Sequence, residues 1–219
     1  MATKLQVWKQ ALIHLGQATI TTLTDDVEAR YVFDTAWDGV VEEAFNEGDW
    51  NFAKKSGALV ASATGTVAPG WTYVWDYPTD YLRTLAVSQY AGFRDPFREY
   101  LDEGGFLHSN TTPIYLRYIS DDKMDNVEDW PTMFWRYVAM KLAYETCDRI
   151  TNGATTQDRL EARLQKALRQ AKSVDARNEN NKVIYPGSWL RSRRSGAGIG
   201  GTDGGTLVGG QISFEEGDV

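Results

Sequence analysis

Residues 25–48 have the sequence DDVEARYVFDTAWDGVVEEAFNEG, in which apolar side chains recur at every third or fourth position. This spacing continues for four turns and predicts an amphipathic helix with one apolar face. We expect Asp25 or Asp26 to cap its first turn and Gly48 to end it. The pattern is the strongest secondary-structure signal in the chain, so we expect this helix to belong to a helical core. Its apolar positions are Ala29, Val32, Phe33, Ala36, Trp37, Val40, Val41, Ala44 and Phe45.

Two shorter segments extend this core. Residues 3–15 carry an apolar stripe that Gly16 ends, which predicts a short amphipathic helix. Residues 50–53, Trp-Asn-Phe-Ala, follow Gly48 and bring two large aromatic side chains. Because such side chains bury a large apolar area, we expect them to fold back onto the helical core.

Helical patterns return in the second half of the chain. Residues 133–147 are apolar on more than one face, which predicts a helix buried between neighbours. We expect Asp129 to cap this helix and Pro131 to lie in its first turn. Residues 156–177 have a narrower apolar stripe with basic side chains outside it, so we expect this last helix on a surface or against a partner. The residues of the stripe are Leu160, Leu164, Ala167, Leu168, Ala171 and Val174.

Between these helical segments the apolar pattern alternates instead. Strands are predicted over residues 56–64, 71–77, 81–89 and 114–119. Residues 95–101 are expected to form a helical turn or a loop. Turns are expected at Pro69-Gly70, Pro78-Thr79-Asp80 and Gly104-Gly105.

Four aromatic residues, Trp71, Tyr73, Trp75 and Tyr77, share one side of the second predicted strand. Alternating aromatic residues of this kind usually fill a core or a subunit interface, and this is the interpretation we favour. Stacking of the rings on sugars or bases is the alternative.

The patterns together predict an α+β protein that is mainly α. A helical bundle is expected from residues 1–55 and 124–178, with an antiparallel β-rich insertion at 56–123. Residues 179–219 are expected to form an extended C-terminal tail, since residues 196–219 contain nine of the twenty glycines and few large apolar side chains.

The predicted tail changes its charge along its length. Residues 182–194 have four positive charges and no acid, whereas residues 203–219 have four acids and no base. The basic part is interpreted as an anchor on another protein, because Trp and Arg often carry interface energy. A solvated linker and a nucleic-acid contact remain alternatives. The proposed anchor residues are Trp189, Leu190, Arg191, Arg193 and Arg194.

Composition excludes several classes of protein. The net charge of −7 argues against a nucleic-acid-binding surface across the whole chain. Cys147 is the single cysteine, so no internal disulfide can form, and we expect it to be a small buried side chain. No apolar run approaches the roughly 20 residues that span a bilayer, and the N-terminal residues lack an apolar signal core. We therefore expect neither export nor insertion into a membrane.

Motifs for catalysis are missing from the sequence. His14 and His108 belong to no zinc-binding pattern, and neither a P-loop nor a nucleophile elbow occurs. Glu42 with Glu43, and Glu99 with Asp102, are the nearest groupings of carboxylates, and a charged surface explains them. We therefore predict no catalytic residue, cofactor or metal, and we expect that the protein is not an enzyme.

Several short motifs occur in a characteristic order. They are Leu15-Gly16, Ile20, Leu23-x-Asp25-Asp26, a helix opening with Ala29, Trp50-Asn51-Phe52-Ala53, Gly70-Trp71-x-Tyr73 and Pro78-x-Asp80. Over residues 5–85 this set resembles the tail tubular protein A family of short-tailed bacteriophages. It is also similar to related head-completion and adaptor proteins of other tailed phages and gene transfer agents.

The resemblance implies a structural head-to-tail adaptor. Such a protein forms a ring of twelve subunits under the portal, each with a helical bundle and a β insertion, at the head–tail junction of the virion. It implies the portal protein and a downstream tail or nozzle protein as partners, and assembly in the host cytoplasm. Genome DNA would pass through the channel without specific binding. In such adaptors the C-terminal extension docks on the portal, which is the role expected for Trp189, Leu190, Arg191, Arg193 and Arg194. An additional peptidoglycan hydrolase activity and a DNA-packaging accessory role are the alternatives.

Overall fold

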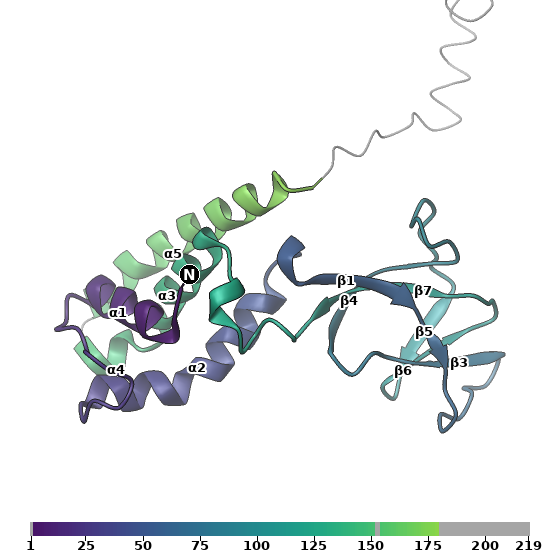
Figure 1. The fold of residues 1–219 in the computed structure, drawn as a ribbon, viewed down its shortest axis with the longest axis horizontal. Coiled ribbons are helices and arrows are strands. Elements are labelled where there is room, and N and C mark those ends of the chain that lie inside the picture. The colour runs from purple at the N-terminus through teal and green to yellow at the C-terminus, as the bar shows by residue number, and fades with distance from the viewer. Residues whose placement is uncertain (1, 152–153, 180–219) are drawn as a thin grey trace, which may run out of the picture. The chain divides into compact units, whose positions relative to one another are not determined.

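The computed structural model describes residues 2–151 and 154–179 and confirms a mixed α+β fold that is mainly α. Figure 1 shows the helices gathered in one bundle and the strands in a separate group. The helices are α1 (Lys4–Leu15), α2 (Glu28–Asn46), α3 (Thr132–Glu145), α4 (Cys147–Thr151) and α5 (Ala154–Ala176). The strands are β1 (Lys54–Ala58), β2 (Val60–Ala61), β3 (Tyr73–Asp76), β4 (Tyr81–Ser88), β5 (Tyr100–Glu103), β6 (Phe106–Ser109) and β7 (Tyr115–Ser120). Within the described ranges, each helix is too short or too polar to cross a bilayer.

Helix α3 lies at the centre of the bundle, as its apolar faces predict. It contacts α1, α2 and α5, and eight of its side chains are buried, Lys141 among them. The segment after α2 also folds back as expected, because Trp50 is 1% exposed and lies 4.8 Å from Phe134 between ring centroids. The largest fully buried side chains of the bundle are Trp8, Phe33, Phe45, Trp50, Phe134 and Tyr137.

The N-terminal cap of α2 differs from the prediction. Val27 occupies the N-cap position without a side-chain hydrogen bond, so neither Asp25 nor Asp26 caps the helix. Asp25 instead accepts hydrogen bonds from the backbone N–H groups of Thr21 and Thr22, at 2.6 and 3.2 Å, in the preceding turn. At the other end, the last helical residue is Asn46 and Glu47 is the C-cap, so Gly48 directly follows the helix, as predicted. A Cβ atom at Gly48 would lie 2.7 Å from the Trp50 ring, so glycine is needed there for close packing.

The predicted cap of α3 is also wrong. Pro131 occupies the N-cap position, one residue before the first turn, and no side chain caps the helix. Asp129 lies in a short 3₁₀ helix (Val127–Asp129) and forms an ion pair of 2.5 Å with Lys123. The Asp129 carboxylate therefore forms an ion pair within the segment before α3 and does not cap the helix.

The strands form two antiparallel sheets, with the orders β1-β7-β4 and β2-β3-β6-β5. The strand predicted over residues 56–64 is divided between them, since β1 belongs to the first sheet and β2 to the second. Leu59 lies between these two strands, is 8% exposed, and donates its N–H to the Ile114 carbonyl at 2.9 Å. The chain thus passes from one sheet to the other at a buried residue.

Strands β5 and β6 form a hairpin that was not predicted. Residues 95–101 were expected to be a helical turn or a loop, but Tyr100 and Leu101 begin β5. Gly104 and Gly105 connect the strands with φ of 63° and 82°, both in the left-handed region. A two-residue connection of this kind suits the twist of a hairpin and favours glycine at both positions. The Gly-Gly pair was therefore the available signal.

The strands have an apolar core of their own. Its buried members are Leu59, Trp75, Val87, Leu107, Ile114, Leu116 and Tyr118. Ile119 packs instead with the helical bundle, together with the partly buried Leu82 and Leu85. Residues from β4 and β7 therefore contribute to the packing of the bundle as well as to the sheet.

Candidate partner-binding surfaces

Asp80, one of the ordered motif residues, holds the first sheet together. Its carboxylate accepts hydrogen bonds from Tyr118 and Ser120 of β7, at 3.0 and 2.7 Å, and pairs with Lys55 of β1 at 2.6 Å. Desolvation raises the pKa of this carboxyl, but the hydrogen bonds outweigh it and lower the pKa to about 2. Desolvation and the hydrogen bond to Asp80 raise the pKa of Tyr118 to about 12. This motif position therefore has a structural role.

Replacing Asp80 with asparagine is expected to lower the free energy of unfolding by on the order of 2 kcal/mol at pH 7. The folded-state pKa lies below the usual value of about 4, so the carboxylate stabilises the fold above about pH 4. That contribution is lost as the pH falls toward 2, and the difference between Asp80→Asn and the wild type should shrink with it. Urea unfolding followed by circular dichroism between pH 7 and pH 2.5 measures the difference. The exposed Asp38 supplies the control variant Asp38→Asn, and a difference that does not change with pH would contradict this role.

The four aromatic residues of the second predicted strand divide between packing and exposure. Trp75 is 6% exposed, lies in the core of the sheets, and donates its indole N–H to the Ser109 hydroxyl at 2.8 Å. Tyr77 is partly buried and stacks on Tyr81 with ring centroids 4.1 Å apart. Trp71 precedes β3 and is half-buried, whereas Tyr73 is 37% exposed. Tyr73 is therefore the member of this row most available to a partner.

The residues proposed as a portal anchor, Trp189, Leu190, Arg191, Arg193 and Arg194, lie outside the described residues, as does the rest of the predicted tail beyond Glu179. The described part of the chain ends at Glu179, shortly after α5.

Within residues 2–151 and 154–179, the histidines and carboxylates singled out in the sequence do not come together in one site. Glu42, Glu99 and Asp102 are exposed, and Glu43 pairs with Lys141 at 3.2 Å. His108 is 3% exposed and its Nδ1 atom accepts from a backbone N–H at 3.4 Å. His14 lies near Gln10, with 3.3 Å between their Nε2 atoms, and burial followed by the charge of Arg163 lowers its pKa. The described ranges hold no cluster of three or more His, Cys, Asp or Glu that could bind a metal ion.

Cys147 shows no reactive environment. It is fully buried, and its Sγ atom lies 3.3 Å from the Thr151 hydroxyl. The prediction of a small buried side chain is confirmed.

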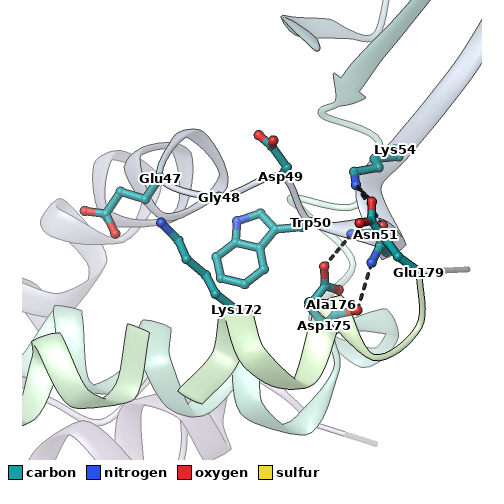
Figure 2. Close-up of a pocket in the computed structure, with 10 residues that line it drawn as sticks. All are labelled: Glu47, Gly48, Asp49, Trp50, Asn51, Lys54, Lys172, Asp175, Ala176 and Glu179. Atoms are coloured by element: carbon teal, nitrogen blue, oxygen red, sulfur yellow. Dashed lines mark hydrogen bonds and ion pairs between the residues drawn. The ribbon is translucent and has the colours of Figure 1, made fainter. Parts of the chain in front are cut away.

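A polar pocket of about 340 Å³ lies between the end of α2, residues 49–54 and the end of α5. Figure 2 shows the residues that line it. The backbone N–H of Asn51 donates to the Asp175 carboxylate at 2.9 Å, and the Asn51 amide donates to the Asp175 carbonyl at 2.8 Å. Lys54 donates to the Asn51 side chain at 2.8 Å and pairs with Glu179 at 2.5 Å. We call these four residues, Asn51, Lys54, Asp175 and Glu179, the α5 anchor.

Most charged side chains of this pocket have a hydrogen-bond or ion-pair partner, either within the lining or just outside it. Burial raises the pKa of Asp175, while the hydrogen bond from Asn51 opposes the shift. Asp49 pairs with Arg83 at 2.8 Å, and Glu47 pairs with Lys141. Buried or half-buried polar groups that satisfy each other in this way are typical of a structural junction. The pocket therefore fastens the end of α5 to the segment that enters β1. Sequence reasoning missed it, because its partners lie more than a hundred residues apart.

A second surface lies on the outer side of α5. A groove of about 520 Å³ is lined by Met133, Lys166, Arg169, Gln170, Ser173, Val174 and Arg177. Four of these positions, 166, 169, 170 and 173, are related by steps of three and four on α5 and so share one helix face, and Arg177 directly follows the helix. Three of the lining side chains are basic, none is acidic, and Met133 with Val174 supplies an apolar floor. We call this surface the basic groove.

The basic groove fits the expectation that the last helix lies on a surface or against a partner. Its cations are exposed, and Val174 is 36% exposed although it belongs to the predicted apolar stripe. The stripe is otherwise turned toward the bundle, where Leu160, Leu164 and Ala171 are buried.

No protein-family model matches the chain, and no curated protein is significantly similar to it in sequence.

Proposed function

We propose that this chain is a structural head-to-tail adaptor of a tailed bacteriophage, and not an enzyme. The observation that carries the proposal is the arrangement of the fold. The chain leaves the helical bundle after α2, forms two small antiparallel sheets, and returns to the bundle with α3. A helical bundle with a β insertion is the subunit architecture that the resemblance of residues 5–85 implies.

The ordered motifs that carry the resemblance support this architecture in physical terms. Gly16 ends α1 in the left-handed conformation, with φ of 71°. Trp50 is buried in the bundle, and Asp80 ties β7 to β1. These residues shape the fold rather than a catalytic centre, as expected for a protein whose role is assembly.

A ring of identical subunits needs two different faces on each subunit, because its contacts are heterologous. The outer side of α5 and the sheets, with the exposed Tyr73, are the candidates for these faces. The partners in this proposal are eleven further copies, the portal protein on one side and a downstream tail or nozzle protein on the other. Genome DNA would pass the negatively charged chain without specific binding. The protein would assemble in the host cytoplasm and remain at the head–tail junction of the virion.

Imaging of the purified chain, alone and mixed with the portal protein of the same phage, tests the proposal. We expect a twelve-membered ring on the portal, and fewer or no rings from the chain alone. A chain cut after Asn178 should retain its helical circular dichroism and lose attachment, since the anchor assigned to Trp189 and the neighbouring arginines would be missing. If the full chain forms no ring on the portal, the adaptor function is wrong. If the cut chain attaches to the portal as well as the full chain does, the assignment of Trp189 and the neighbouring arginines as portal-binding residues is wrong.

A further inference from the structure

The basic groove on α5 is a charged surface without charged partners among the described residues. Elsewhere in the described chain, some surface cations pair with carboxylates, for example Lys4 with Asp34, Lys123 with Asp129 and Arg149 with Glu28. No described carboxylate lies within 4.0 Å of Lys166, Arg169 or Arg177. Residues 162–174 contain four cations and no acid. The groove therefore favours an acidic occupant.

The lining also favours an occupant with an apolar side chain. Met133 and Val174 line the groove together with the cations. A thioether packs well on the edge of an aromatic ring, and a guanidinium packs on its face. An occupant that combines an aromatic residue with neighbouring carboxylates would satisfy both parts of the groove.

The chain itself contains such a segment. Residues 203–219 hold four acids and no base, and residues 211–218 have the sequence QISFEEGD, in which Phe214 is followed by Glu215 and Glu216. Residues 178–213 connect the groove to Phe214 and, at about 3.4 Å per residue, reach up to about 120 Å. This length allows Phe214 to reach the groove of its own chain or that of a second copy.

We propose that the acidic segment 203–219 of this chain binds the basic groove of α5, with Phe214 on Met133 and Val174 and with Glu215 and Glu216 beside the cations. This inference goes beyond the adaptor function and does not rest on it. Nucleic acid also presents negative charge to a basic surface, but the apolar floor is a poor match for a phosphate backbone. The net charge of −7 would in addition repel a polyanion as a whole.

Disulfide trapping in the full chain tests the proposal. Ser173 lines the groove, and Ser213 precedes Phe214, so Ser173→Cys and Ser213→Cys place two thiols together if the segment binds. The native Cys147 is fully buried and provides little background. The matched control replaces Gln165, which is exposed on α5 outside the groove lining, in place of Ser173. We expect the groove pair to cross-link about tenfold faster than the control pair under mild oxidation, because binding raises the local concentration of the second thiol.

Charge reversal separates specific binding from chance encounter. Glu215→Lys with Glu216→Lys should reduce cross-linking to the control rate, and adding Lys166→Glu with Arg169→Glu should restore it. A cross-linked monomer would show binding to the chain's own groove, and a cross-linked dimer binding to a second copy; both support the proposal. Equal rates for the groove and control pairs would overturn it. Binding of a fluorescent DNA duplex to the full chain through Lys166 and Arg169, together with equal cross-linking rates, would also overturn the proposal. The groove would then be a site for phosphate groups.

Discussion

Replacing Trp50 with alanine is expected to lower the free energy of unfolding by about 4 kcal/mol, near the upper end for the loss of a large buried aromatic side chain. Trp50 is 1% exposed, and its ring contacts Phe134 and Tyr137 at centroid distances of 4.8 and 6.3 Å. Its indole N–H donates to the Ala44 carbonyl at 2.8 Å, near the C-terminal end of α2. The substitution would therefore leave a cavity and also remove the partner of a carbonyl at a helix end.

Urea unfolding followed at 222 nm measures this effect, because circular dichroism does not depend on the tryptophan fluorescence that the substitution removes. Trp50→Phe keeps most of the apolar contact and loses the hydrogen bond, so we expect a cost of about 1 to 2 kcal/mol. Tyr90→Ala removes an aromatic side chain that is 59% exposed and should change stability by less than about 0.5 kcal/mol. A cost for Trp50→Ala similar to that of Tyr90→Ala would show that the bundle does not depend on this side chain.

The helices were predictable because their packing follows local periodicity. An apolar face recurs along α2, and a helix with two apolar faces, such as α3, must be covered on both sides. Their caps were not predictable in the same way. Asp25 and Asp129 are good capping residues, but the turns before the helices use their carboxylates, through Thr21 and Lys123 respectively. Competition between a helix and its neighbouring turn depends on the path of the backbone, which composition does not specify.

Most of the strands were predictable from the sequence, but the pairing of the strands within the sheets was not. β1 pairs with β7 in a register that joins Lys54 to Ile119, and no local signal links positions so far apart in the sequence. The hairpin of β5 and β6 is different, because the turn at Gly104-Gly105 was predicted correctly and only the short strands on either side of it were missed.

For the candidate surfaces as well, local features were predictable from the sequence and long-range contacts were not. The basic character of α5 was visible in the sequence, as was the aromatic row of residues 71–77. The α5 anchor was not, since Asn51 and Asp175 meet only when the chain has folded. Nor could the sequence distinguish Trp75, which is buried, from Tyr73, which alternation places on the same side of the strand and which is more exposed.

A second large effect is expected at the ion pair between α2 and α3. Lys141 is 3% exposed and pairs with Glu47 at 2.6 Å and with Glu43 at 3.2 Å. The buried Tyr137 also donates its hydroxyl to Glu47. Glu47→Ala would leave a buried ammonium with one exposed partner and a buried hydroxyl without an acceptor. We expect a loss of about 3 kcal/mol in the free energy of unfolding, which is typical when one member of a buried pair is removed.

Replacing the other member of the pair, Lys141, should lower the free energy of unfolding much less. Lys141→Met has a similar volume and removes the charge that burial penalises, while Glu47 is 31% exposed and can be solvated. We expect a change of less than about 1 kcal/mol for Lys141→Met, and we expect Glu47→Ala to be less harmful in the Lys141→Met background than in the wild type. Urea unfolding of the two single variants and the double variant closes this cycle. Equal costs for both single variants, with no coupling between them, would show that burial of the ammonium is not what makes Glu47 necessary.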